Sequence, residues 1–69
     1  MNKEEAIKAM QDGKTIRHRR FTAYEIMSMY PNGDYRLQDD SIIIAHCTPE
    51  EFWKNRQDSS WSIDWEIVS

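Results

Sequence analysis

The chain has 69 residues, 9 of them basic and 12 acidic, and its formal net charge is −3 at pH 7. This length predicts one small domain over residues 1–69, and the acidic balance argues against nucleic-acid binding, which favours a basic domain. Cys47 is the single cysteine, which excludes an intrachain disulfide and fits a reducing cytoplasm. No apolar run predicts a membrane span or a signal peptide, so we expect a cytoplasmic protein without membrane contacts.

The N-terminal segment predicts a short helix followed by a strand. Asn2 and Glu5 match a capping box, and the apolar residues after them recur at helical spacing. We therefore expect a helix over residues 3–12, ended by Gly13 in a left-handed conformation. Residues 15–20 carry a single aliphatic side chain among several charges, which favours a short edge strand, because edge strands tolerate charge.

The middle of the chain predicts a β-hairpin and a third strand. Residues 22–30 suit either a strand or a helical turn, but the Pro-Asn-Gly-Asp turn at 31–34 favours the hairpin. The returning strand, residues 34–38, then places Tyr35 and Leu37 on one face. After a turn at 39–40, the β-branched run at 41–45 predicts a short buried strand.

A second helix and a final strand complete the pattern. Thr48 is a good N-cap and is followed by proline and two acids, so we expect a helix from Pro49 to about Arg56. Residues 58–60 form a turn. In the last segment apolar and polar residues alternate, which predicts one strand face made of Trp61, Ile63, Trp65 and Ile67. The fold class is therefore α+β, a small and mostly antiparallel sheet in the order α-β-β-β-β-α-β.

No set of residues in the sequence predicts catalysis. His46 and Cys47 are adjacent, so in a strand they point to opposite faces and cannot form a nucleophile–base pair. With His18 they are too few for a structural zinc site, which takes four ligands. There is no glycine-rich phosphate loop. We expect no enzyme activity, no cofactor and no metal.

The basic segment is the best functional candidate in the sequence. Lys14, Arg17, Arg19 and Arg20 lie within seven residues of an otherwise acidic chain. Arginine side chains bind phosphates and carboxylates well, and Arg17 and Arg19 share one strand face. The alternative interpretation is a solvated, protective strand edge. The tryptophans have a similar alternative, since large aromatic side chains fill a small core well.

The two ends of the chain resemble the Thoeris anti-defence sponge family of small phage proteins and its uncharacterised relatives. Members open with a helix of the form E-A-L-x-x-L-x-x-G-K-x-V-x-R followed by an aromatic residue, and residues 5–17 read EAIKAMQDGKTIR, followed by Phe21. Members close with D-W-E-I-V, which stands at residues 64–68. The resemblance implies an oligomer that sequesters a cyclic ADP-ribose-type signal without turning it over.

Binding such a nucleotide requires cationic groups for the phosphates and aromatic faces for the base. The residues we expect to bind the ligand are Arg17, Arg19, Arg20, Phe21, Trp53 and Arg56. A homo-oligomer is also expected because a core of this size rarely supplies more than about 3–5 kcal/mol. The alternative function is a protein-binding inhibitor, similar to an anti-CRISPR or a host-takeover factor, whose acidic second half contacts a host or defence protein.

Overall fold

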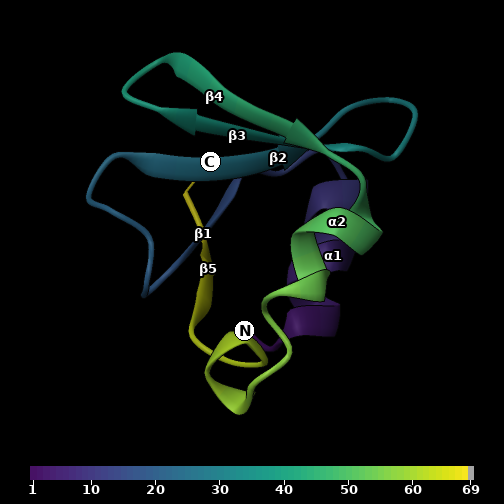
Figure 1. Ribbon diagram of the computed structural model, residues 1–69, viewed down its shortest axis with the longest axis vertical. Coiled ribbons are helices and arrows are strands. Elements are labelled where there is room, and N and C mark those ends of the chain that lie inside the picture. Colours follow the sequence, from purple (N-terminus) through teal and green to yellow (C-terminus); the bar gives the residue numbers. More distant parts are fainter. Residues whose placement is uncertain (69) are drawn as a thin grey trace.

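The structure, a computed structural model, describes residues 1–68 and confirms the predicted α+β class and element order. The elements are α1 (Lys3–Gln11), β1 (Ile16–His18), β2 (Glu25–Met29), β3 (Tyr35–Asp39), β4 (Ile42–Cys47), α2 (Pro49–Lys54), a 3-10 turn η1 (Ser59–Trp61) and β5 (Trp65–Ile67). Figure 1 shows both helices beside the sheet. Within residues 1–68, neither helix has the length and apolar character that crossing a membrane requires.

The sheet is antiparallel and its strands lie in the order β4-β3-β2-β1-β5. The prediction that residues 15–20 form an edge strand is therefore wrong, because β1 has neighbours on both sides. The C-terminal strand returns to pair with β1, and His18 lies opposite Trp65. This long-range pairing makes β1 an inner strand in spite of its charges.

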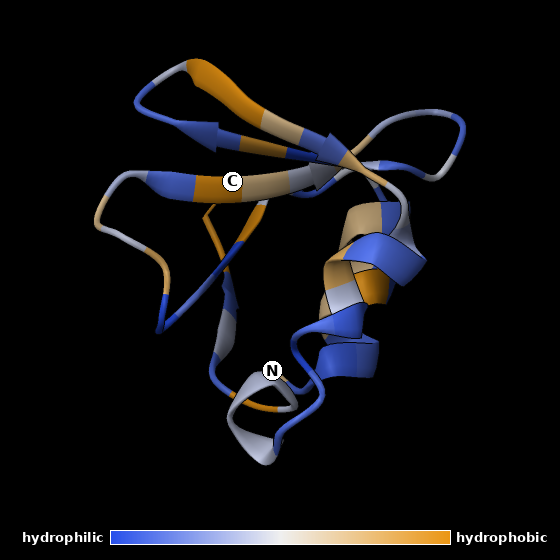
Figure 2. Cartoon of the chain, viewed as in Figure 1, coloured by the Kyte–Doolittle hydropathy of each residue, from blue (hydrophilic) through white to orange (hydrophobic). Residues whose placement is uncertain are grey.

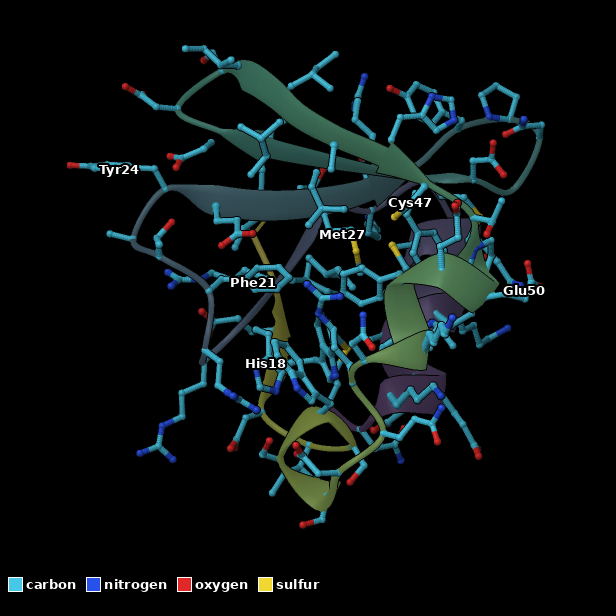
Figure 3. The ribbon with its side chains drawn as sticks, in the orientation of Figure 1. His18, Phe21, Tyr24, Met27, Cys47 and Glu50 are labelled. Carbon is cyan, nitrogen blue, oxygen red and sulfur yellow. The ribbon has the colours of Figure 1, made fainter. Side chains whose placement is uncertain are left out.

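The core lies between the sheet and the two helices. Ile16, Met27 and Leu37 are neighbours across three strands, so their side chains share the covered face. In Figure 3, Phe21 and Met27 are seen within this layer. Aromatic side chains supply most of its volume, since each buries a large apolar area. The buried apolar residues are Ala6, Ala9, Met10, Ile16, Phe21, Met27, Tyr35, Leu37, Phe52, Trp53, Trp61 and Trp65.

The helix ends follow the local signals of the sequence. The Asn2–Glu5 capping box of α1 is confirmed, with hydrogen bonds in both directions, and Gly13 follows the helix with φ of +86°. Thr48 and Glu51 form a second capping box at α2, which ends at Lys54, two residues before the predicted end. The hairpin of β2 and β3 is also confirmed, with Tyr35 and Leu37 both buried on one face.

The prediction of a buried strand at residues 41–45 is wrong. β4 is an edge strand, and Ile42, Ile43 and Ile44 are 67%, 54% and 51% exposed. Figure 2 shows this apolar stretch at the start of β4, away from the helices. β-branched residues favour any strand, buried or exposed, so their presence alone does not place β4 inside the sheet.

The prediction for the last strand is half right. Trp61 and Trp65 are both buried, but Ile63 and Ile67 are about half exposed. Trp61 belongs to η1, and Asp64 adopts a left-handed conformation with φ of 68°, so only Trp65–Ile67 form β5. The change of backbone direction at Asp64 breaks the expected alternation.

Acid should destabilise the protein partly through the caps of α2 and η1. The backbone N–H of Thr48 hydrogen bonds the Glu51 carboxylate at 2.8 Å and lowers its pKa from 4.5, and Ser60 lowers the pKa of Asp58 from 3.8. As the pH falls below about 4.5, the unfolded chain takes up these protons first, so the free energy of unfolding decreases. Urea denaturation over a series of pH values measures this decrease.

A matched variant isolates the contribution of Glu51 to this pH dependence. Glu51→Gln keeps a hydrogen-bond acceptor for the cap but has no charge to titrate. Its free energy of unfolding should fall less steeply in acid than that of the parent. An acid profile identical to that of the parent would show that the Glu51 carboxylate is not stabilised by the cap.

Candidate functional site

The cations of the basic segment do not form a separate basic patch, because each arginine has a carboxylate near it. Arg17 lies 3.6 Å from Glu66, Arg19 lies 3.8 Å from Asp64, and Arg20 lies 3.8 Å from Asp58. Pairs of this kind on the surface contribute about 0–1 kcal/mol. A shallow hollow of about 490 Å³ near Arg17 and Arg19 is lined by Met1, Arg17, Arg19, Asp64, Trp65 and Glu66.

A larger hollow, which we call the α2 groove, lies between the start of α1, the end of α2 and η1. It has a volume of about 600 Å³, within the range of about 300–1,000 Å³ typical of small-molecule sites. It holds three basic and two acidic side chains together with two tryptophans. The lining residues are Lys3, Glu50, Trp53, Lys54, Arg56, Gln57, Asp58, Trp61 and Ser62.

One wall of the α2 groove is set by the orientation of α2. The Thr48 cap fixes the start of the helix, and this turns Phe52 and Trp53 toward the core. The indole N–H of Trp53 donates to the Tyr35 hydroxyl at 3.0 Å, which fixes the plane of the ring. The Lys3 ammonium lies 4.3 Å from the centre of the Trp53 ring, so the start of α1 brings a cation onto this aromatic face.

Arg56 supplies the second cation of the α2 groove. Its Nη1 donates to the Phe52 carbonyl at 2.9 Å, and its guanidinium lies 4.1 Å from the Phe52 ring centre and 5.3 Å from that of Trp61. Its Nε is buried without a hydrogen-bond partner within residues 1–68. A buried donor left without a partner costs about 1–3 kcal/mol.

The structure therefore divides the predicted ligand residues between several places. Trp53 and Arg56 meet in the α2 groove. Arg20 lies 4.7 Å from the Trp61 ring and donates to the Ser60 hydroxyl, beside the same groove but outside its lining. Phe21 is buried against the rings of Trp61 and Trp65. Figure 3 shows Phe21 inside the core layer. Arg17 and Arg19 lie at the other hollow.

Seven of the nine residues that line the α2 groove, Lys3 and Trp61 among them, were not predicted to bind a ligand. Lys3 reaches the groove through the packing of α1 beside α2, which no local pattern indicates. Trp61 was expected on a strand face with Trp65. In the sequence, the one indication that Trp61 could join the groove is its closeness to Arg56, which lies shortly before η1.

Reactive groups are few in the described part of the chain. His46 and Cys47 point to opposite faces of β4, because His46 lies opposite Arg36 and Cys47 lies opposite Tyr35. Burial raises the pKa of the Cys47 thiol and of the Tyr35 hydroxyl, so both stay protonated near neutral pH. Within residues 1–68, no three His, Cys, Asp or Glu side chains come together as metal ligands.

No family model, no curated protein and no solved structure matches this chain. The resemblance to the anti-defence sponge family stays a hypothesis that rests on the two ends of the sequence.

Proposed function

We propose that this protein binds a nucleotide-type anion in the α2 groove and performs no chemical step on it. The observation that supports the proposal best is the placement of Arg56. Its guanidinium lies over two aromatic rings and belongs to the lining of the groove. A phosphate oxygen is a strong acceptor for such a donor.

The other side chains of the α2 groove define the kind of ligand. Lys3 and Lys54 add positive charge for phosphates, and the Lys3 ammonium lies over the ring of Trp53, an aromatic residue of the groove lining. Glu50 and Asp58 add negative charge and can accept hydrogen bonds from sugar hydroxyls. This combination favours a nucleotide with few phosphates over a highly charged polyanion.

The biological setting of the proposal comes from the resemblance of the two ends of the chain. In that setting the protein is phage-encoded and acts in the host cytoplasm as a homo-oligomer. It counters a defence system by sequestering the signal, which requires affinity and no turnover. The proposed ligand residues fit this requirement, because they bind charge and stack on rings.

The proposal predicts a loss of affinity when the groove cations are removed. Arg56→Gln and Lys3→Gln should each weaken binding of ADP by about 10- to 100-fold, because a charge-assisted hydrogen bond contributes about 1.5–3 kcal/mol. Isothermal titration calorimetry measures the affinity. Arg19→Gln is the matched control, since the Arg19 side chain is 82% exposed and lies outside the groove.

The same titrations can contradict the proposal in two ways. Equal affinity for ADP in the parent and in Arg56→Gln, or no binding in the parent, would remove the α2 groove as the nucleotide site. A second measurement concerns turnover: ADP and cyclic ADP-ribose recovered after denaturing the protein should be chemically intact. Converted product in proportion to protein concentration would show an enzyme.

A second candidate function is a protein-binding inhibitor of a host or defence protein. The observation that favours it is the exposed apolar stretch on β4, which a partner protein would cover. This surface lies outside the α2 groove, so the two functions make separate predictions.

A further inference from the structure

Arg20 lies beside the α2 groove, whereas Arg17 and Arg19 of the same basic segment line the other hollow. The Arg20 guanidinium lies 4.7 Å from the centre of the Trp61 ring, and Trp61 belongs to the lining of the groove. The Arg56 guanidinium lies 5.3 Å from the same ring centre. The two guanidinium carbons are therefore separated by at most the sum of these distances, 10.0 Å.

The surroundings of Arg20 hold its guanidinium in place and leave most of its donors available. Its Nη1 donates to the Ser60 hydroxyl at 2.8 Å. The Trp61 ring is itself fixed, because it packs on His18 with 4.4 Å between the ring centres. An arginine has five N–H donors in a rigid fork, and within residues 1–68 the Nε and Nη2 of Arg20 have no hydrogen-bond partner. The side chain is 51% exposed, so an acceptor from solution can reach these donors.

The carboxylate paired with Arg20, that of Asp58, does not occupy the guanidinium. Its Oδ2 lies 3.8 Å from Nη1 of Arg20, which is beyond hydrogen-bond distance. Its Oδ1 accepts from the backbone N–H of Ser60 at 3.0 Å and from the Ser60 hydroxyl, so the carboxylate is held as the N-cap of η1. An exposed ion pair of this kind contributes little to stability, so a ligand can bind Arg20 without a large loss.

We propose that Arg20 binds a second phosphate of the ligand whose first phosphate lies at Arg56, so that the α2 groove prefers nucleotides with two phosphates over those with one. This inference rests on the proposed function and adds to it the class of nucleotide. A diphosphate can accept from both guanidiniums across their separation, because each charge-assisted hydrogen bond adds about 2.8 Å between ligand and fork. With Arg20, the excess of positive over negative side chains at the site rises from one to two, which favours the more highly charged ligand.

The first test compares ADP with AMP, which share the base and the ribose and differ by one phosphate. In isothermal titration calorimetry the parent should bind ADP about 10-fold more tightly than AMP. Arg20→Gln should weaken ADP binding about 10-fold and leave the affinity for AMP nearly unchanged, because the lost contact concerns the second phosphate. Arg19→Gln is the matched control, since this neighbouring side chain is 82% exposed and lies outside the groove, and it should change neither affinity.

The second test separates a direct contact from an effect through Asp58. Without Arg20, the Asp58 carboxylate in the groove lining would lose its cation and would repel phosphates more strongly. Asp58→Asn removes this charge, and asparagine remains a good N-cap for η1. Adding Arg20→Gln to Asp58→Asn should still weaken ADP binding about 10-fold relative to Asp58→Asn alone. An unchanged affinity in this comparison would overturn the proposal, because Arg20 would then only offset the charge of Asp58.

The results that overturn the role of Arg20 differ from the result that overturns the proposed function. A parent protein that binds neither ADP nor AMP removes the nucleotide site, and the role of Arg20 with it. A parent that binds ADP, together with equal losses of ADP and AMP affinity in Arg20→Gln, keeps the site and overturns the role of Arg20, because such a residue only positions η1. Equal affinity of the parent for ADP and AMP also overturns it. Circular dichroism of each variant should match that of the parent, so that a change in affinity reports on the site.

Discussion

Trp65→Ala should remove most of the stability of this protein. Trp65 is 2% exposed and its ring contacts the rings of His18, Phe21 and Trp53. Its indole N–H also donates to the Trp61 carbonyl at 2.8 Å, which holds η1 against β5. Truncating a buried tryptophan costs about 3–5 kcal/mol, which equals the whole margin that a single core of this size supplies. Far-ultraviolet circular dichroism should show a largely unfolded chain at room temperature.

A variant on the same strand separates the loss of core packing from a general weakness of β5. Ile67→Ala lies two residues further along β5, and Ile67 is about half exposed, so its melting temperature should fall much less. Trp65→Phe should be intermediate, because it keeps a ring in the core and loses the hydrogen bond to Trp61. A melting temperature unchanged in Trp65→Ala would contradict the central position of this side chain.

The sequence predicted the elements whose signals are local. The capping pairs Asn2–Glu5 and Thr48–Glu51 are three residues apart, and both form as expected. The turn at residues 31–34 likewise resolved the choice between strand and helix for the preceding segment in favour of a strand. Signals of this kind depend on a few consecutive residues, so they do not require knowledge of the tertiary structure.

The order of the strands could not be predicted, because it depends on pairing between distant segments. The pairing of β1 with β5 makes Arg17 the cross-strand neighbour of Glu66, and nothing near Arg17 in the sequence indicates this. The same pairing displaces β4 to the edge, although the β-branched residues of Ile42–Cys47 suit an inner strand equally well. The wrong predictions for β1 and for β4 therefore have one physical cause, which is that β5 pairs with β1.

In the candidate site too, the sequence predicted what depends on neighbouring residues and missed what depends on contacts between distant segments. Trp53 and Arg56 were predicted together and meet in the α2 groove, because residues three apart at a helix end lie on the same side. Lys3 and Trp61 complete the groove only through packing of segments from opposite ends of the chain. Arg17 and Arg19, predicted with the others, lie at a separate hollow, because β1 and the residue that follows it lie beside β5 and Asp64.

Nothing in the sequence indicated that the His18 side chain is important for stability. Its substitution should lower the free energy of unfolding nearly as much as that of Trp65. Its side chain is 1% exposed, and Figure 3 places it between the sheet and the η1 segment. Its Nε2 lies 2.8 Å from the carbonyl oxygens of both Ser60 and Ile63, so this nitrogen carries the proton and donates. Its Nδ1 accepts from the backbone N–H of Arg20 at 3.0 Å. The ring therefore joins β1 to the loop before β5.

His18→Phe should lower the free energy of unfolding by about 2–4 kcal/mol, since each buried polar group left without a partner costs about 1–3 kcal/mol. The substitution keeps an aromatic ring of similar shape, so the loss reports mainly the hydrogen bonds. His46→Phe is the matched control at the other histidine, which is exposed on β4, and it should cost little. Urea denaturation measures both changes. Nitrogen NMR of the parent should show the His18 proton on Nε2, and either equal stability of the two variants or a proton on Nδ1 would contradict this role.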